Sequence, residues 1–521
     1  MPSRRLSSRA AAVILCAASS AAAPWRDAAS APTAAPRVRA GFALSKTFGN
    51  HMVLQVPTPL IYGFDAPGAA VNISVDGGAA VASGVTGADG IWRLSLPPQV
   101  YGGPHALALA STSGGAAALT DVYFGEVFLC GGQSNMQFSV HAMLNATAVI
   151  ADSVNHPLLR LFTVGQGTQS PTPLDDLATV EQAWAVGGPA SVTDGQDFSF
   201  FSATCYMFGL DVQAQIGSGV AIGLISSNWG GTCMQNWSPP NAAIDACGIP
   251  SVPNLYNALI YPYVVGPFSI NGFIWSQGEC NADANQTDYY ACAFPAFINA
   301  WRAAFNRPNA FFGFQVLPAY VNDSGKFSPY SLPYERAAQL QGLRAGGAVH
   351  AANTIDLGDA TAPHGSVHPR NKTAVGARLA AGAAALAFGR PVPYAAPAYL
   401  RADAVTAGAT ATVTVAFAAR PNAAPTLLLA PAACPAGDGG LPASECAWFD
   451  IQLADGSFVN ATGVALSPDA TQLVLSAAVP AGARVNATRG FFAPWPVVVL
   501  FSAEGLPALP WWEPVATAAV L

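Results

Sequence analysis

The pattern of apolar and polar residues divides the chain into a long central region and two flanking β-rich regions. From 42 to 119, short runs of alternating apolar and polar residues, such as 71–75 and 91–96, are separated by Asp-Gly pairs at 76–77 and 89–90. Alternation with a period of two between such turns is typical of paired strands. We therefore predict an N-terminal β domain over 42–119.

The central region, 120–390, has a different pattern. Apolar runs of four to eight residues alternate with longer stretches of helical periodicity, which indicates βαβ units around a mostly parallel sheet. The expected strands lie at 127–130, 220–226, 273–276, 311–317 and 352–356, and a closing helix lies at 373–388, before Gly389 and Pro391.

Strand-like alternation returns after residue 391, for example at 411–417, and continues to 497–501. We predict a C-terminal β region over 391–521. The predicted fold class is therefore α/β, a parallel sheet with helices on both faces, flanked by N- and C-terminal β-sandwich-like regions.

The first 23 residues have the features of a secretory signal peptide. Three arginines, Arg4, Arg5 and Arg9, precede an apolar stretch at 10–18 and a small-residue cleavage site at 21–23. We expect a disordered lead-in at 24–41 and a secreted or lysosomal protein. We expect no stable membrane insertion, because the apolar stretches are too short to span a bilayer.

The charge and cysteine content narrow the possible functions. A formal net charge of −7 gives no basic surface for nucleic acid, so we expect no nucleic-acid partner. Cleavage would remove Cys16 and leave eight of the nine cysteines, an even number that suits disulfides; Cys434 and Cys446 are a plausible pair. Since no C-x-x-C pair occurs, we expect no metal site.

Eight N-x-S/T sequons suit a glycoprotein, although some are chance matches. Asn236 is expected to be unmodified, because a glycan there would obstruct the candidate site described below, and Asn371 is not among the expected acceptors. The expected acceptors are Asn72, Asn145, Asn285, Asn322, Asn460 and Asn486.

Polar, glycine-bearing segments follow four of the expected central strands. In open α/β sheets, ligands bind beyond the carboxyl ends of the strands, so we expect these segments to share one rim. They are Gly131-Gly132-Gln133-Ser134, Asn228-Trp229-Gly230-Gly231-Thr232, Gln277-Gly278-Glu279-Cys280-Asn281, and a loop that holds Asp359, His364 and His368.

Ser134 is a candidate nucleophile. Gly131 and Gly132 permit a sharp turn from strand to helix that exposes the hydroxyl, and N–H groups beside it suit a developing oxyanion. Met136 stands where a G-x-S-x-G elbow has its second glycine. On local sequence alone, an N-cap serine without chemistry is the stronger alternative.

Acyl transfer at a serine requires a base, and histidine is the usual one. Of the seven histidines, His51 and His105 fall in the N-terminal β domain. His368 precedes Pro369, a good first helical residue, and therefore lies at a loop end. His364, four residues earlier, is the rival candidate.

Four motifs together resemble the sialate O-acetylesterases, which belong to the SGNH (GDSL-like) hydrolases. The similarity runs from 42–44 and 51–55 to 504–508, nearly the whole mature chain. It implies an SGNH-type catalytic domain over 120–390 and an O-acetylated sugar as substrate, with no cofactor. The motifs are GGQSNM at 131–136, WGGT at 229–232, WSQGECN at 275–281 and HPRNKTAVGARLA at 368–380.

The resemblance implies roles for matching residues. Ser134 would attack the acetyl carbonyl, with His368 as general base and then general acid. Backbone N–H groups of Ser134 and Gly231, together with Gln277 or Asn281, would stabilise the oxyanion; Gln277 is preferred because it follows its strand most directly. The residues expected at the substrate are Gln133, Trp237 and Glu279.

The acidic partner is where this chain departs from the pattern. Gly365 stands where the Asp-x-x-His arrangement of many SGNH hydrolases has its acid. Asp359 is the first candidate and Asp356 the alternative; a backbone carbonyl could instead orient the imidazole and give a Ser–His dyad.

The sugar and the activity also have alternatives. Another acetylated glycan, such as acetylxylan, is the alternative to sialic acid, whose carboxylate could meet Arg336, Arg344 or Arg370. A carbohydrate-binding protein with a degenerate site is the alternative to an enzyme, because Cys280 interrupts the third motif and the usual acid is missing.

Overall fold

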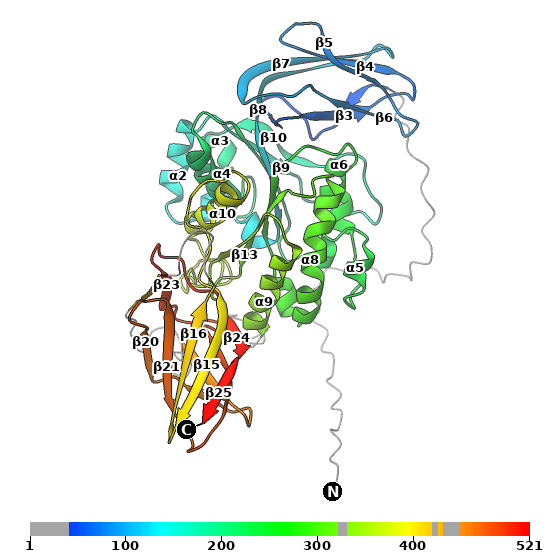
Figure 1. Cartoon of the computed structure of the whole chain (residues 1–521). Helices are drawn as coiled ribbons and strands as arrows, with labels where there is room; N and C mark the ends of the chain where they lie inside the picture. The colour runs from blue at the N-terminus through cyan, green and yellow to red at the C-terminus, as the bar shows by residue number, and fades with distance from the viewer. Residues whose placement is uncertain (1–40, 321–330, 419–425, 431–447, 521) are drawn as a thin grey trace. The chain divides into compact units, whose positions relative to one another are not determined.

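The computed structural model describes residues 41–320, 331–418, 426–430 and 448–520. Its central sheet (Figure 1) lies among the helices of the chain. The strand order of this sheet is β10-β9-β11-β8-β12-β13-β14, parallel throughout except where β10 joins β9. These strands are β8 (Ala116–Gly132), β9 (Leu159–Val164), β10 (Val180–Val186), β11 (Ile222–Asn228), β12 (Gly272–Ser276), β13 (Phe311–Val316) and β14 (Val349–Asn353). The predicted α/β fold is confirmed.

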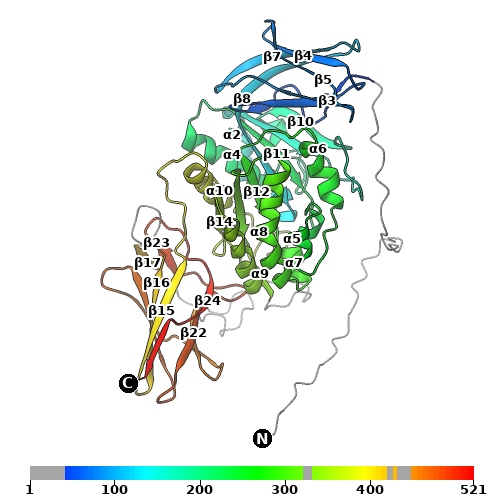
Figure 2. The same ribbon diagram turned by 45° about the vertical axis from the view of Figure 1, so that its right-hand side comes forward.

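Helices cover both faces of this sheet, and the sequence of β8 explains why. Successive side chains of a strand point to opposite faces. Val127 and Leu129 belong to the apolar cluster that includes α8 (Thr287–Ala304). Phe128 and Cys130 belong to the cluster that includes α4 (Ala203–Ile216) and α10 (Lys372–Leu386). Figure 2 shows α8 and α10 on opposite sides of the central strands.

A disulfide between Cys130 on β8 and Cys205 on α4 joins the sheet to its covering helix. The two cysteines are 75 residues apart in sequence. Closing a loop of that size stabilises the fold by restricting the unfolded chain, at roughly 2–4 kcal/mol for typical disulfides. Disulfides were expected from the even cysteine count, but the sequence does not give this pairing.

An N-terminal β-rich region joins the central sheet through one long strand. Strand β8 pairs with β2 and β7 in its first part and with β11 and β12 in its last part, so it crosses the boundary predicted at 119–120. The N-terminal strands are β1 (Ala43–Leu44), β2 (Val53–Gln55), β3 (Leu60–Phe64), β4 (Ala70–Val75), β5 (Ala80–Val85), β6 (Ile91–Ser95) and β7 (Gly102–Ser111).

A second β-rich region follows α10. In the described residues it forms sheets of five, four and two strands around its own apolar cluster. The strands are β15 (Tyr399–Ala407), β16 (Thr410–Phe417), β17 (Leu427–Leu429), β18 (Phe449–Leu453), β19 (Phe458–Asn460), β20 (Gly463–Leu466), β21 (Gln472–Ala478), β22 (Val485–Gly490), β23 (Leu500–Ser502), β24 (Trp511–Pro514) and β25 (Thr517–Val520).

Several local predictions can be compared with these elements. The strand expected at 352–356 lies three residues earlier, as β14, which leaves Asp356 in a turn. β9 and β10 were not predicted. Within the described residues, no helix combines the length and apolarity needed to cross a membrane.

The expected glycosylation sites that lie in the described residues are accessible to solvent. The side chains of five of them are exposed, namely Asn72, Asn145, Asn285, Asn460 and Asn486. The proposed signal peptide, Asn322, Cys434 and Cys446 lie outside the described residues. Their modification, cleavage and pairing therefore stay predictions.

Candidate active site

The turn that carries Ser134 depends on Gly132. This residue is the last of β8 and has a φ of +140°, and a Cβ built on it would lie 2.1 Å from the carbonyl oxygen of Ser276 on the neighbouring strand β12. Only glycine fits so close an approach of two backbones. The chain then turns into α1 (Ser134–Gln137), which places a half-buried Ser134 directly beyond the end of the sheet.

The loop after β11 lies against Ser134. A Cβ built on Gly230 would be 3.4 Å from Cβ of Ser134, and the Gly230 N–H donates to Oε1 of Gln137 on α1 at 2.7 Å. Gly231 follows with a φ of +71° and is exposed. Within the described part of the chain, the N–H groups of Ser134 and Gly231 have no hydrogen-bond acceptor. Both expected backbone donors are therefore unengaged, one in Ser134 itself and one in the residue that follows Gly230.

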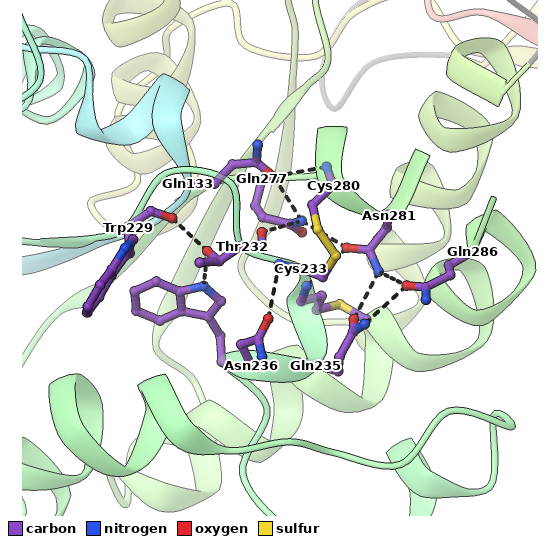
Figure 3. Close-up of a disulfide and its surroundings, with 12 residues drawn as sticks. Gln133, Trp229, Thr232, Cys233, Gln235, Asn236, Gln277, Cys280, Asn281 and Gln286 are labelled. Atoms are coloured by element: carbon purple, nitrogen blue, oxygen red, sulfur yellow. Dashed lines mark hydrogen bonds between the residues drawn. A yellow bond between two sulfur atoms is a disulfide. The ribbon is translucent and has the colours of Figure 1, made fainter. Parts of the chain in front are cut away.

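Gln277 and Asn281 are held differently from the expectation. Both are fully buried. The Gln277 Nε2 group donates to Oδ1 of Asn281, Oε1 of Gln133 and the carbonyl of Thr232 (Figure 3). The Asn281 Nδ2 group donates to Gln235 and Gln286. Both amide groups are therefore bonded within the protein and hold the surrounding loops together, and their role as oxyanion donors stays a prediction.

A disulfide fastens the same loops to each other. Cys233, in the loop after β11, is bonded to Cys280, in the segment after β12 (Figure 3). The Cys280 N–H also donates to Oε1 of Gln133, next to Ser134. Cys280 therefore does not weaken the third motif, because it joins the three strand-end segments around Ser134.

The three residues expected to contact substrate are interior. Gln133 is 3%, Trp237 0% and Glu279 2% exposed. The indole of Trp237 donates to Thr232 and packs edge-on against Trp275. These side chains therefore form part of the interior beneath the strand-end loops, and their contact with a sugar stays a prediction.

His368 has a defined orientation. Its Nδ1 lies 2.8 Å from the carbonyl oxygen of His364. A carbonyl can only accept a hydrogen bond, so Nδ1 carries the proton and Nε2 keeps its lone pair. The ring stacks on Phe138 at 6.4 Å and meets Phe198 edge-on at 5.2 Å. Burial lowers the pKa of His368, which favours the neutral imidazole, the form that can accept a proton.

His364 supports this arrangement and is itself anchored. Its Nε2 is 2.7 Å from Oδ2 of Asp197, whose other oxygen contacts Nδ1 of His141 at 2.8 Å. Because the ring of His364 is engaged by Asp197, its carbonyl is held toward His368. Among the two histidines considered from sequence, His364 therefore positions the loop and His368 offers a free nitrogen.

Neither predicted acid contacts His368. Asp359 binds the guanidinium of Arg370 through both oxygens, at 2.6 and 3.0 Å, and this pairing lowers its pKa to about 2. Asp356 forms a similar pair with Arg378, at 2.5 and 2.7 Å. An arginine on the same loop or on α10 pairs with each carboxylate, so neither predicted acid is placed to contact the imidazole in this structure.

Asn135 connects the nucleophile and the base, and the sequence did not single it out. Its Nδ2 group donates to the carbonyl of Val367, the residue before His368, at 2.8 Å. Within the described residues, Ser134 Oγ and His368 share no hydrogen bond, but their neighbours do. Catalytic hydrogen bonds often close only in the substrate complex. In the sequence, the position of Asn135 next to Ser134 in the GGQSNM motif is the feature that could have indicated its role.

Comparisons with known proteins identify the family of this chain. The family described as carbohydrate esterase, sialic acid-specific acetylesterase, matches residues 124–383. The sialate O-acetylesterase of Pongo abelii is 34% identical over 382 residues, 67% of this chain and 72% of the relative. That of Mus musculus is 32% identical over 410 residues, 67% of this chain and 74% of the relative. The chain belongs to the sialate O-acetylesterase family.

A solved structure extends the similarity beyond the central domain. A carbohydrate acetylesterase from Xanthomonas citri has 29% sequence identity and a TM-score of 0.74, and the match covers 90% of this chain and 99% of that one. This sialate O-acetylesterase family member is therefore a carbohydrate esterase with an SGNH-type fold. In the described residues, no group of three or more His, Cys, Asp or Glu side chains could hold a metal ion.

Proposed function

We propose that this esterase hydrolyses O-acetyl esters of sialic acids through an acetyl-enzyme on Ser134. The observation that carries the proposal is the orientation of His368. Its Nδ1 is engaged by a backbone carbonyl, which leaves Nε2 as a base on the loop that Asn135 ties to the nucleophile turn. Two curated relatives named sialate O-acetylesterase supply the substrate class.

In the first half of the reaction, Oγ of Ser134 attacks the acetyl carbonyl while Nε2 of His368 takes its proton. The N–H groups of Ser134 and Gly231 stabilise the negative oxygen that forms, and each such donor contributes about 3 kcal/mol to the transition state. The tetrahedral intermediate collapses, and His368 returns the proton to the departing sugar oxygen. Water then attacks the acetyl-enzyme by the same steps and releases acetate.

The base is oriented by a carbonyl where many serine hydrolases use an acid. The His364 carbonyl fixes the tautomer of His368, as a carboxylate would, but carries only a partial negative charge. It stabilises the imidazolium less than a carboxylate does. We therefore describe the machinery as a Ser134–His368 dyad.

The arginines considered for the sialic acid carboxylate are mostly occupied. Arg336 is fully buried and donates to four backbone carbonyls, and Arg370 is paired with Asp359. Arg344 is exposed. Arginines that are already paired within the protein are poorly placed to bind the carboxylate of an acidic sugar. An acetyl ester of a neutral glycan, such as acetylxylan, is therefore the second candidate substrate.

The test is acetate release by the full-length protein from O-acetylated sialic acid and from acetylated xylan at equal ester concentration. The proposal expects a higher kcat/KM on sialic acid, together with a transient mass increase of one acetyl group on the peptide that contains Ser134. Preference for xylan would support the second candidate, and turnover without acetyl-Ser134 would contradict the mechanism.

A dyad predicts a small effect for Asp359→Asn. The substitution removes the charge that pairs with Arg370 but leaves the His364 carbonyl in place. We expect kcat/KM to fall by less than about 10-fold, whereas loss of a triad acid costs about 10⁴-fold in kcat. Asp356→Asn, which breaks the similar pair with Arg378, is the matched control. A loss near 10⁴-fold for Asp359→Asn alone would restore Asp359 as the acid.

A further inference from the structure

A buried lysine lies behind the nucleophile turn, and the mechanism above does not use it. Lys372 is the first residue of α10 and is fully buried. Its Nζ donates to Oδ1 of Asn135 at 2.6 Å and lies 4.8 Å from the ring centroid of Phe138. A buried ammonium group is costly unless it is paired and hydrogen-bonded. These two contacts are with α1, the short helix that begins at Ser134, and with Phe138, the residue directly after it.

Asn135 also forms hydrogen bonds with two other segments of the chain. Its Nδ2 group donates to Oε1 of Glu279 at 2.5 Å and to the Val367 carbonyl at 2.8 Å. Lys372 can only donate, whereas a carboxylate and a carbonyl can only accept. The oxygen of the Asn135 amide must therefore point to Lys372, and its nitrogen must point to Glu279 and Val367. In this way Lys372 fixes the orientation of the amide. That orientation sends one N–H to the residue before His368.

The same lysine supplies charge to the site. Burial raises the pKa of Glu279 and lowers the pKa of Lys372 to about 7, and the two opposite charges counteract these shifts. Lys372 also contacts Phe138, whose ring stacks on His368. Among the described residues, the charged groups that act on the imidazole are Lys372 on α10 and His364 on its own loop. Asp197 is paired with His364, and Glu279 is bonded to Asn135.

We propose that Lys372 is a positioning residue of the esterase site, which sets the spacing between Ser134 and His368 through the amide of Asn135. The inference rests on the proposed dyad and extends it to a buried Lys372–Asn135–Glu279 network. Removing the lysine leaves Oδ1 of Asn135 without its donor and Glu279 without its counter-charge. The amide is then free to turn, and the contact with Val367 that holds the base segment is lost.

The test compares Lys372→Met with Lys46→Met in the full-length protein. Lys46 is an exposed lysine that donates to the carbonyl of Leu177, so it controls for the substitution itself. We expect Lys372→Met to lower kcat by about 10- to 100-fold, because small misplacements of reacting groups cost this much, and to change KM by less than about 3-fold. Lys46→Met should leave both constants near the wild-type values.

The pH profile separates positioning from a merely structural role. The positive charge of Lys372 lowers the pKa of His368, so its removal should move the acid limb of kcat/KM to higher pH. A protein that is only less stable would keep the limb where it is. Unchanged kcat and an unchanged limb in folded Lys372→Met would overturn the proposal.

A second variant covers the case in which Lys372→Met does not fold. Asn135→Asp keeps an oxygen for Lys372 but replaces the amide N–H groups that hold Val367 and Glu279, so kcat should again fall with little change in KM. Retained wild-type kcat in Asn135→Asp would contradict the inference. Labelling of the wild type at Ser134 by a fluorophosphonate probe distinguishes failure of the Lys372 proposal from failure of the proposed function. A labelled, active wild type with unaffected variants defeats only the role of Lys372, whereas an unlabelled, inactive wild type defeats the proposed function as well.

Discussion

Replacing Ser134 with alanine should lower kcat for acetyl-ester hydrolysis by about 10⁴- to 10⁶-fold, the loss seen when a serine hydrolase is deprived of its nucleophile. Ser134 is half-buried at the start of α1, and its hydroxyl has no hydrogen bond in the described residues. The substitution therefore removes little that stabilises the fold, and the melting temperature should change by only a few degrees. Acetate release and thermal unfolding measure the two effects.

Ser113→Ala is the matched control, because Ser113 is an exposed serine of the N-terminal β-rich region. It should keep wild-type turnover. If Ser134→Ala also kept its turnover, Ser134 would not be the nucleophile. A wild-type protein that released no acetate would instead favour a carbohydrate-binding protein with a degenerate site.

The sequence predicted the rim of the sheet well, for a physical reason. Buried parallel strands are continuous apolar runs, and glycines mark where each run ends. The carboxyl ends of β8, β11 and β12 are within two residues of the predicted ones. The loops after these strands meet around Ser134, as expected. Parallel pairing places all these ends on one side, so polar residues distant in sequence come together.

The roles of polar residues inside the motifs could not be predicted in the same way. Gln133 and Gln277 are bonded to each other across 144 residues, and neither residue's neighbours in sequence reveal this partner. A polar side chain that faces a substrate and one that holds two loops together have the same local sequence. The acidic partner could not be assigned for a similar reason, because Asp359 is paired with Arg370 and the sequence of the loop does not reveal that ion pair.

Replacing His368 with glutamine should lower kcat/KM by about 10⁴-fold or more, because the substitution removes the imidazole that acts as the base for Ser134. Glutamine retains a polar group of similar length, and the stacking on Phe138 is the main packing that is lost. His364→Ala is the matched control at the rival histidine. It removes the contact with Asp197 but keeps the backbone carbonyl that orients His368, so the loss should stay within about 10-fold. The reverse order of effects would make His364 the base.

The pH dependence of the wild-type enzyme gives an independent check on His368. The base must be unprotonated, so kcat/KM should fall as the pH drops through the pKa of this imidazole. Burial lowers that pKa; the His364 carbonyl opposes the shift, and the charges of Lys372 and His364 add to it. The acid limb should therefore have its midpoint below about pH 6.5, the ordinary value for histidine. A midpoint clearly above that value would mean that a carboxylate stabilises the imidazolium, which is the signature of a triad and not of the dyad.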